Sequence, residues 1–206
     1  SGDVAFAQMA GAGVIQSNLK GADIVMIAGI LNTMNYQFIV DKTVQRPDQL
    51  KGKALAVSRY GSSSDFAIRF ALDKYGLVPD KDVKILEIGT QPDRFAVLET
   101  GKVQGVMLEV PQSLHAKTKG FRVLANLKML GLEYQHTGLA TTRALIKSQP
   151  DLVRNVMKAY VEGIHYYKTN RQESLTVLAK YLKTNNAEAL KEIHADIGLA
   201  LVPAKP

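Results

Sequence analysis

Three serines stand at positions 62–64, directly after Gly61 and before a run whose apolar residues have helical spacing. The apolar stretch Ala54–Val57 upstream indicates a buried strand, so the serines lie at a strand-to-helix turn. Such a turn directs backbone N–H groups, the positive end of the helix dipole and hydroxyl groups toward one point, where an anion or a polar small molecule could bind. The alternative is that one serine, or Asp65, only caps the helix.

Two further features near strand ends could take part in binding. Glu109 closes an apolar run at residues 106–110 and would be either an acceptor or cation partner in a cleft, or a capped or solvated strand end. Arg59 and Tyr60 directly precede the serine turn and could supply charge or stacking. A solvated arginine and a packed tyrosine fit equally well, so the sequence leaves both alternatives open.

The motifs of several enzyme classes are absent from the sequence. There is no P-loop, no complete dinucleotide-binding glycine fingerprint, no G-x-S-x-G nucleophile elbow and no H-E-x-x-H zinc motif. The four histidines are far apart along the chain, and the lack of cysteine rules out disulfides and thiolate metal sites. We therefore expect no catalytic residue, no metal and no cofactor.

Composition narrows the class of protein further. The 206 residues are 46% hydrophobic and 22% charged, which suits one large or two small domains with a real core. The formal net charge of +7 comes from scattered bases, so it favours a solvated surface over nucleic-acid binding. No apolar run approaches the ~20 residues of a membrane span. A chain without cysteine fits the periplasm and the cytosol equally well.

Strands alternate with helices through residue 142, which predicts an α/β fold with a parallel sheet and right-handed crossovers. We expect strands at residues 3–7, 22–30, 37–40, 54–57, 84–88, 106–110 and 122–127. The turns that follow strands, at residues 8–9, 29–35, 59–65, 89–93 and 109–112, are all polar. Ligands of such folds bind beyond the carboxyl ends of the strands, so these turns are candidates for a shared site.

The chain becomes almost entirely helical after Pro150. Residues 131–138 are predicted to be a loop and residues 139–142 to be extended, and a long amphipathic helix begins at Pro150. Its apolar stripe is expected to lie in the core, and comprises Leu152, Val156, Tyr160, Ile164 and Tyr167. Two shorter helices follow.

Five stretches resemble the nitrate, sulfonate, taurine and thiamine-pyrimidine type of ABC-transporter substrate-binding protein. They are SGDVAFA, ADIVMIAGI, RPDQLKGKALAVSRYGSSSDFAIRFALDKYGL, RFAVLETGKVQGVMLEVPQ and TRALIKSQPDLVRNVMKAYVEGIHYYKTN. The most specific part is QLKGK at residues 49–53, followed by a strand and GSSS. The element VLETGKVQG is similar to the family's A-L-x-x-G-x-V-D-A, with Gln104 and Gly105 in place of the usual Asp and Ala.

The resemblance implies a type II periplasmic-binding-protein-like α/β fold with a ligand cleft between two lobes. Lobe I would be residues 1–45 and 140–206, lobe II would be residues 46–139, and hinge closure would occur near residues 44–48 and 138–142. The resemblance also implies a βαβ unit before Ser1 and further structure after Pro206, so lobe I would be incomplete. Exposed sheet edge and apolar helix faces would then favour a homodimer or low stability.

The resemblance further implies that the ligand is held by residues from several strand ends. The expected ligand-binding residues are Gln8, Met9, Asn32, Tyr60, Ser62, Ser63, Ser64, Asp65 and Glu109. Ligands of this family range from sulfonates and nitrate to pyrimidines. A purely anionic ligand would be disfavoured if Glu109 faces the cleft, because an unpaired like charge is unfavourable.

The function implied is that of a periplasmic or lipid-anchored solute-binding protein that delivers its ligand to a membrane permease without chemistry. Two alternatives remain. One is an enzyme similar to those of thiamine-pyrimidine synthesis, which carry a cysteine-rich segment that this chain lacks. The other is a ligand-sensing domain of a regulator.

Overall fold

The computed structural model describes residues 4–201, and the chain divides into two compact units. Unit 1 comprises Ser1–Thr33 and Tyr134–Pro206, and unit 2 comprises Met34–Glu133. The units divide at 33/34 and 133/134. The lobe boundaries that the family resemblance implies, at 45/46 and 139/140, stay a prediction. Residues 34–45 belong to unit 2 because they contain β3 (Gln37–Val40), which pairs with two strands of that unit's sheet.

Unit 2 is built on a five-stranded mixed sheet with the order β5-β4-β6-β3-β7. Its other strands are β4 (Ala54–Val57), β5 (Lys84–Glu87), β6 (Gly105–Leu108) and β7 (Arg122–Asn126). β4 runs parallel to β5 and β6, but β3 runs antiparallel to β6 and β7. The predicted parallel pairing is therefore confirmed for β4 with β5 and β6 and is wrong for β3. Only a 3-10 turn, η1 (Pro47–Leu50), lies between β3 and β4, and no crossover helix joins them.

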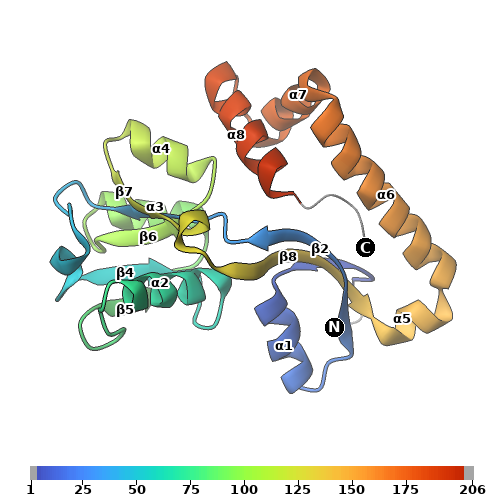
Figure 1. The fold of residues 1–206 in the computed structure, drawn as a ribbon, viewed down its shortest axis with the longest axis horizontal. Helices are drawn as coiled ribbons and strands as arrows, with labels where there is room; N and C mark the ends of the chain where they lie inside the picture. Colours follow the sequence, from blue (N-terminus) through green and yellow to red (C-terminus); the bar gives the residue numbers. More distant parts are fainter. Residues whose placement is uncertain (1–3, 202–206) are drawn as a thin grey trace. The chain divides into compact units, whose positions relative to one another are not determined.

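Helices cover both faces of this sheet (Figure 1). α2 (Ser63–Lys74) packs on one face against β4 and β6, while α3 (Gln91–Glu99) and α4 (Gln112–Thr118) pack on the other. The α3 and α4 face holds a buried apolar cluster that includes Phe95 and Leu98. The core is dense: a Cβ on Gly105 would come within 2.8 Å of both Leu55 and Phe38.

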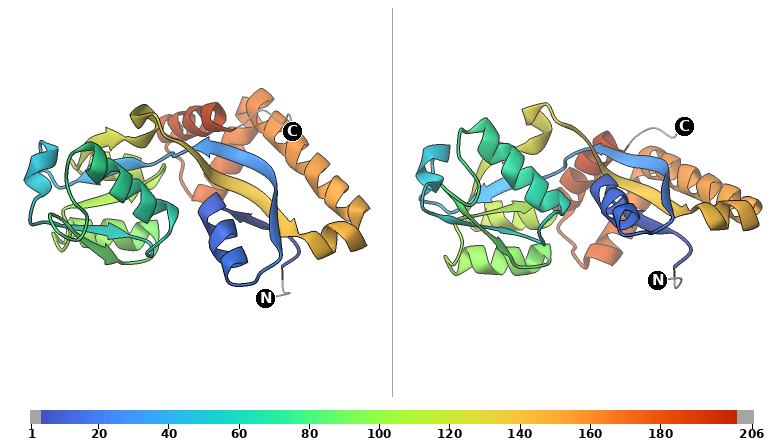
Figure 2. Two further views of the ribbon diagram at one scale, coloured as in Figure 1. Left: turned by 60° about the horizontal axis from the view of Figure 1, so that its bottom comes forward. Right: turned by 90° about the horizontal axis from the view of Figure 1, so that it is seen from below.

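Unit 1 contains a three-stranded sheet with the order β1-β8-β2, drawn in Figure 2. Its strands are β1 (Ala7–Met9), β2 (Ile24–Thr33) and β8 (Glu133–Thr142), and α1 (Gly11–Leu19) joins the first two. The loop predicted at 131–138 is confirmed for residues 131–132 only, because residues 133–138 belong to β8. The strand predicted at 3–7 begins instead at Ala7, and Asp3 lies outside the described residues.

The helical part of unit 1 consists of α5 (Arg143–Ser148), α6 (Pro150–Thr169), α7 (Arg171–Leu182) and α8 (Ala187–Ala200). α6 begins at Pro150 as predicted, but its stripe is not core. None of its residues is buried, and Leu152 is 40% exposed. An apolar stripe indicates which face of a helix packs against a partner. The described residues bury this face of α6 only in part. No helix among residues 4–201 is long and apolar enough to cross a bilayer.

Candidate functional site

Three strands of unit 2 end together at one edge of the sheet. Val57 of β4 is in register with Glu87 of β5, and Ala56 of β4 is in register with Val106 of β6. The residues that follow these parallel strands therefore emerge side by side, as the strand-end rule predicts. They are the turn that starts at Ser58, the turn after Glu87, and Glu109.

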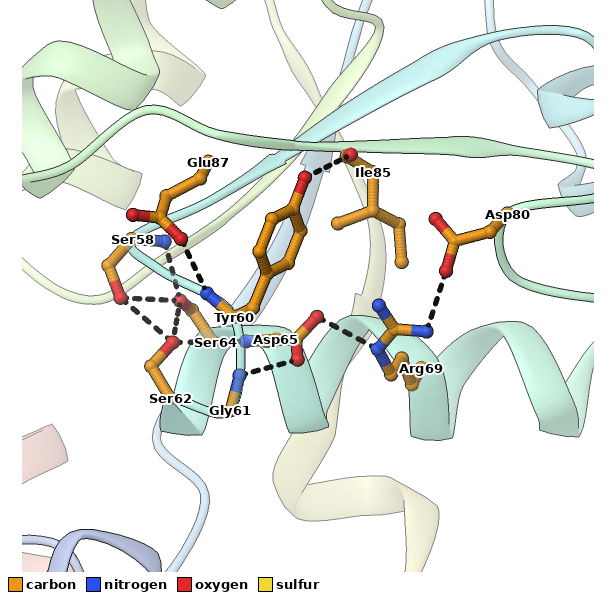
Figure 3. Close-up of polar contacts among 10 residues, drawn as sticks. All are labelled: Ser58, Tyr60, Gly61, Ser62, Ser64, Asp65, Arg69, Asp80, Ile85 and Glu87. Carbon is orange, nitrogen blue, oxygen red and sulfur yellow. Dashed lines mark hydrogen bonds and ion pairs between the residues drawn. The ribbon is translucent and has the colours of Figure 1, made fainter. Parts of the chain in front are cut away.

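The serine turn between β4 and α2 closes on itself through side-chain hydroxyls (Figure 3). The Oγ atoms of Ser58, Ser62 and Ser64 form a triangle with sides of 2.9, 3.0 and 3.0 Å, and the backbone N–H of Ser58 donates to Ser64 Oγ at 2.9 Å. Ser62 is also the N-cap of α2 and accepts from the N–H of Asp65. The capping interpretation is therefore confirmed for Ser62, and three hydroxyls also gather at the N-terminus of α2, while ligand binding there stays a prediction.

Asp65 has a structural role in this turn. Its side chain is buried, accepts from the N–H of Gly61 at 2.8 Å and pairs with Arg69 at 2.9 Å. Arg69 also bonds Asp80 at 3.0 Å, so Arg69 ties the start of α2 to the loop before β5. Gly61 has φ +74°, a conformation that glycine adopts at little cost. These contacts hold the N-terminus of α2 in place.

Tyr60 extends the same edge with a fixed aromatic ring. Its backbone N–H donates to Glu87 Oε2 at 2.9 Å and its hydroxyl donates to the Ile85 carbonyl at 3.1 Å, yet the residue is 55% exposed. Figure 3 shows the ring lying between the serine turn and β5. A tyrosine anchored at both ends with an open face can stack on a planar group.

Glu109, the first residue after β6, is held by Gln91 from the first turn of α3. The amide of Gln91 donates to Glu109 Oε2 at 2.9 Å and accepts from the backbone N–H of Glu109 at 2.8 Å. Glu109 is half-buried, so its carboxylate is neither freely solvated nor enclosed in the core. Of the alternatives that the sequence left open, the capped strand end describes these contacts, and a role of Glu109 in ligand binding stays a prediction.

Buried polar atoms without a hydrogen-bond partner in the described chain gather on the same side of unit 2. Gln37 Oε1 lies at the start of β3, in register with the end of β6, and Ser113 Oγ lies on α4 shortly after Glu109. Arg94 Nε, on α3, is a third such atom. Unsatisfied buried polar atoms are uncommon, so their concentration beside the strand ends marks this edge as a polar site rather than ordinary core.

The remaining predicted site residues belong to unit 1. Gln8 and Met9 are in β1, paired with Leu139 and Gly138 of β8. Gln8 is exposed, whereas the Met9 side chain lies against α1, 3.1 Å from the position of a Cβ on Gly13. Asn32 is in β2, not in a link after it, and is exposed.

Gly29 explains how the Asn32 side chain is accommodated. A Cβ there would meet Asn32 Oδ1 and Gln135 Oε1, each at 2.8 Å, so both polar side chains lie over a glycine. Gln135 itself donates to the carbonyls of Leu31 and Thr137, which links β2 and β8. The polar end of β2 is thus an organised part of unit 1.

Sequence reasoning missed several residues that organise the unit 2 edge: Ser58, Glu87, Gln91 and Arg94. Ser58 and Glu87 stand at strand ends and could have been found by taking the residue at each strand terminus. Gln91 lies in the polar turn at residues 89–93 that the strand-end rule marks as a candidate, although the sequence did not single it out. Arg94 lies on α3, and nothing in its local sequence indicates that it reaches β6. Within residues 4–201 no three His, Cys, Asp or Glu side chains are arranged to hold a metal ion.

Comparison with known sequences gives one family match. The family described as "NMT1/THI5 like" matches residues 1–174 of the chain. No curated protein matches it in sequence.

Solved structures match the fold over nearly the whole chain. The alkanesulfonate-binding protein SsuA from Xanthomonas axonopodis pv. citri, bound to MOPS, superposes with a TM-score of 0.82 at 21% identity, over 95% of this chain and 67% of that one. The periplasmic aliphatic sulphonate-binding protein SsuA of Escherichia coli gives 0.79 at 20% identity, over 95% and 63%. A Candida albicans gene product with the generic periplasmic binding protein fold gives 0.75 at 19% identity, over 97% and 65%. This chain therefore spans about two thirds of the length of these proteins.

Proposed function

Since this chain belongs to the NMT1/THI5-like family, we propose that it binds a small organic or anionic molecule and delivers it, chemically unchanged, to an ABC importer in the membrane. The ligand class would be sulfonate, nitrate or a pyrimidine-like compound. The protein would work outside the cytoplasmic membrane, in the periplasm or on a lipid anchor, and its macromolecular partner would be the membrane permease.

The observation that carries this proposal is the polar edge of unit 2. Three adjacent strand ends bring together a hydroxyl triangle at a helix N-terminus, an anchored tyrosine ring and a carboxylate fixed by an amide. A helix N-terminus with hydroxyls suits an acceptor or anionic group. The ring suits a flat or apolar part of the ligand, and Glu109 suits a hydrogen-bond donor.

These features support recognition of a small molecule with unlike groups at its two ends. In the proposed complex, unit 1 contributes Gln8, Met9 and Asn32, and unit 2 contributes Tyr60, Ser62, Ser63, Ser64, Asp65 and Glu109. The contacts described above separate the unit 2 residues into two groups. Ser62, Ser64 and Asp65 keep the turn in shape, while Tyr60, which is 55% exposed, and Glu109 are the better candidates for direct contact.

Binding without chemistry is favoured over the enzyme alternative by the residues present at this edge. The hydroxyls of Ser58, Ser62 and Ser64 bond to one another, whereas an activated serine nucleophile bonds to a base such as histidine. The absence of cysteine from the sequence also argues against similarity to the pyrimidine-forming enzymes.

The test is a thermal-shift screen followed by calorimetric titration with methanesulfonate, taurine, nitrate and hydroxymethylpyrimidine. We expect one ligand class to raise the melting temperature, and Glu109→Gln to change its affinity by about tenfold or more, since a charged hydrogen bond contributes about 1.5–3 kcal/mol. Glu162→Gln, at an exposed position of α6, is the matched control and should leave affinity unchanged.

Recovery of the ligand by mass spectrometry completes the test. An unchanged ligand after prolonged incubation is the expected result. A converted product would favour the enzyme, and the absence of any stabilising ligand, together with no effect of Glu109→Gln, would refute the assignment of the site.

A further inference from the structure

The edge of the unit 2 sheet opposite the candidate site is where most of its strands begin. β4, β5 and β6 start together there, since Leu55 of β4 is in register with both Ile85 and Gly105. β3 runs the other way, so its last residue, Val40, lies at the same edge, in register with Gly105 and with Arg122 at the start of β7. The turns next to these residues therefore lie side by side, at the far end of the strands from the serine turn.

Every strand of this sheet brings a base to that edge, at its first residue or in the adjoining turn. We call these exposed residues the basic edge; in the order β5-β4-β6-β3-β7 they are Lys84, Lys53, Lys102, Lys42 and Arg122. They are scattered along the sequence, and the sheet brings them together. At a spacing of about 4.8 Å between neighbouring strands, the row is about 19 Å long.

Backbone and side-chain contacts define the positions of these bases. The N–H of Lys84 donates to the carbonyl of Lys53 at 2.9 Å, so these two residues are direct neighbours. The Lys42 side chain lies beside the turn before β7, where a Cβ on Gly120 would come within 3.6 Å of its Cε. Among residues 4–201, none of the five bases of the basic edge forms an ion pair. Their charges are therefore available to a partner.

The acidic residues beside the basic edge do not cancel its charge. Two of them are in ion pairs with bases outside the row: Asp48 with Arg46 and Glu99 with Lys119. Asp41 and Asp82 are half-buried, and both carboxylates accept hydrogen bonds from neighbouring residues of their own turns. Because the exposed bases outnumber these two carboxylates, the edge carries a net positive charge.

Two ordinary explanations account for part of the row. Lys102 follows the C-terminal turn of α3, where the helix dipole favours a cation. Lys84 and Arg122 are on the edge strands β5 and β7, where charged side chains discourage pairing with another sheet. Neither explanation applies to Lys42 and Lys53, which adjoin internal strands, and neither requires a base from all five strands. The row as a whole favours a partner with negative charge.

The chemistry of the basic edge fits a lipid surface better than a protein or a nucleic acid. All its bases except Arg122 are lysines, whose flexible point charges suit mobile headgroups, whereas arginine is preferred for fixed acceptors and lysine is depleted at protein interfaces. The ring of Phe121 is half-buried, with the Lys42 ammonium 5.5 Å from its centre, so it is not an open platform for a nucleic-acid base.

We propose that the basic edge is a docking surface for an anionic lipid bilayer. Unit 2 then contacts lipid headgroups at the starts of its parallel strands and carries the candidate site at their opposite ends. Attraction of exposed bases to the negative surface potential supplies the binding energy, and no residue enters the hydrocarbon. The inference goes beyond the proposed function and does not rest on it, because it concerns the other edge of the sheet.

Co-sedimentation with vesicles measures this docking. The wild-type protein should bind vesicles of phosphatidylglycerol and phosphatidylcholine in equal amounts, but not vesicles of phosphatidylcholine alone. Raising the salt concentration from about 0.1 M to about 1 M shortens the screening length from about 10 Å to about 3 Å and should abolish binding. Equal binding to both kinds of vesicle, or no binding to either, overturns the proposal.

Paired substitutions locate the surface. Lys53→Gln with Lys84→Gln removes two neighbouring charges, and since one base near an anionic bilayer is worth about fivefold in affinity, binding should weaken by about twentyfold. Lys20→Gln with Lys158→Gln removes the same charge from exposed positions of unit 1 and should leave affinity near the wild-type value. Equal weakening of the two double variants would show that only overall net charge matters, which contradicts a defined surface.

A second measurement uses the unaltered protein, so it does not depend on the folding of a variant. Acetylation of lysines followed by mass spectrometry should show that phosphatidylglycerol vesicles protect Lys42, Lys53 and Lys84, while Lys158 reacts as before. Protection spread evenly over both units, or confined to unit 1, contradicts the proposal.

Soluble polyanions test the two other classes of partner. Poly-glutamate stands for an acidic protein and a DNA duplex for nucleic acid, and both should bind more weakly than the vesicles at the same concentration of negative charge. Tighter binding of either, lost in the variant that lacks Lys53 and Lys84, would overturn the assignment to lipid. All these measurements use the protein without a small-molecule ligand, so failure of the ligand screen would count against the proposed function alone.

Discussion

The two units of this chain treat their apolar side chains differently. Of the buried hydrophobic residues in the described chain, only Ile30, Leu139, Ala140, Leu190 and Ile193 belong to unit 1, and all the others belong to unit 2. Unit 2 has helices on both faces of a five-stranded sheet. Unit 1 has an equally clear set of helices and strands, but α1 and α6 bury no residue.

This contrast shows that a part of the chain can form regular helices and strands without burying their apolar side chains in a core. In unit 2 the strand ends that carry the serine turn and Glu109 stand on fully packed strands, so their geometry is held by the core. In unit 1 the residues Gln8 and Asn32 stand on strands whose side chains are mostly half-buried or exposed. The comparison predicts that the same substitution has different consequences in the two units.

The largest difference is expected for truncation of a leucine. Leu108→Ala in β6 removes a fully buried side chain and should lower the free energy of unfolding by about 2–5 kcal/mol. Leu19→Ala in α1 removes a side chain that is 82% exposed and should change it by less than about 0.5 kcal/mol. Urea unfolding measures both. Equal losses of unfolding free energy would show that Leu19 is buried in solution, and would contradict the difference between the two units.

Added methyl groups should give effects of opposite sign. Gly105→Ala places a Cβ 2.8 Å from Leu55 and Phe38 and should destabilise unit 2 by about 1–3 kcal/mol. Gly163→Ala in α6 meets no atom within 4 Å and should stabilise that helix by about 0.5–1 kcal/mol. Thermal unfolding of both variants provides the check, and destabilisation by Gly163→Ala would mean that the exposed side of α6 is occupied.

Self-association should depend on unit 1 rather than unit 2. Exposed apolar residues of α1, Ile15 at 63% and Leu19 at 82%, are expected to promote a homodimer. Replacing both with lysine should weaken association by about tenfold, or about 1.4 kcal/mol, in sedimentation equilibrium. Val78→Lys, at a 49% exposed site of unit 2, is the matched control. A chain that stays monomeric at all concentrations contradicts this prediction.

The smallest effect concerns a tyrosine in unit 1. Burial, with a contribution from Asp196, raises the pKa of Tyr167 to about 12, and its ring stacks on His194 at 4.5 Å. Because the folded-state pKa lies above the unfolded value of about 10, its contribution is complete below that pH and is lost as the pH rises through the folded value. Since the residue is only half-buried, we expect a loss of about 1 kcal/mol. Tyr167→Phe should lack this component, and identical pH profiles for the two proteins would show that the hydroxyl is solvated.

Local sequence patterns were sufficient to predict those elements that carry capping residues and helical periodicity in their own sequence. The serine turn and its helix and the start of α6 at Pro150 were predictable, because capping and helical periodicity act over a few residues. The family resemblance was also present in the sequence, and residues 1–174 match the family.

Contacts between distant residues were not predictable in this way. The antiparallel direction of β3 and the pairing of residues 133–138 in β8 depend on partners far along the chain. The face of α6 carries the pattern of a core helix, but exposure is decided by what packs against it. No local signal states whether such a partner exists.

For the candidate site, the order of residues alone was enough to establish which turns are polar and that Ser62–Asp65 and Glu109 each follow an apolar run. The folded chain was needed to show that Ser58 completes the hydroxyl triangle, that Gln91 holds Glu109, and that Arg94 is buried beside them. Hydrogen bonds between strand ends depend on distance in space, and separation along the sequence does not measure that distance.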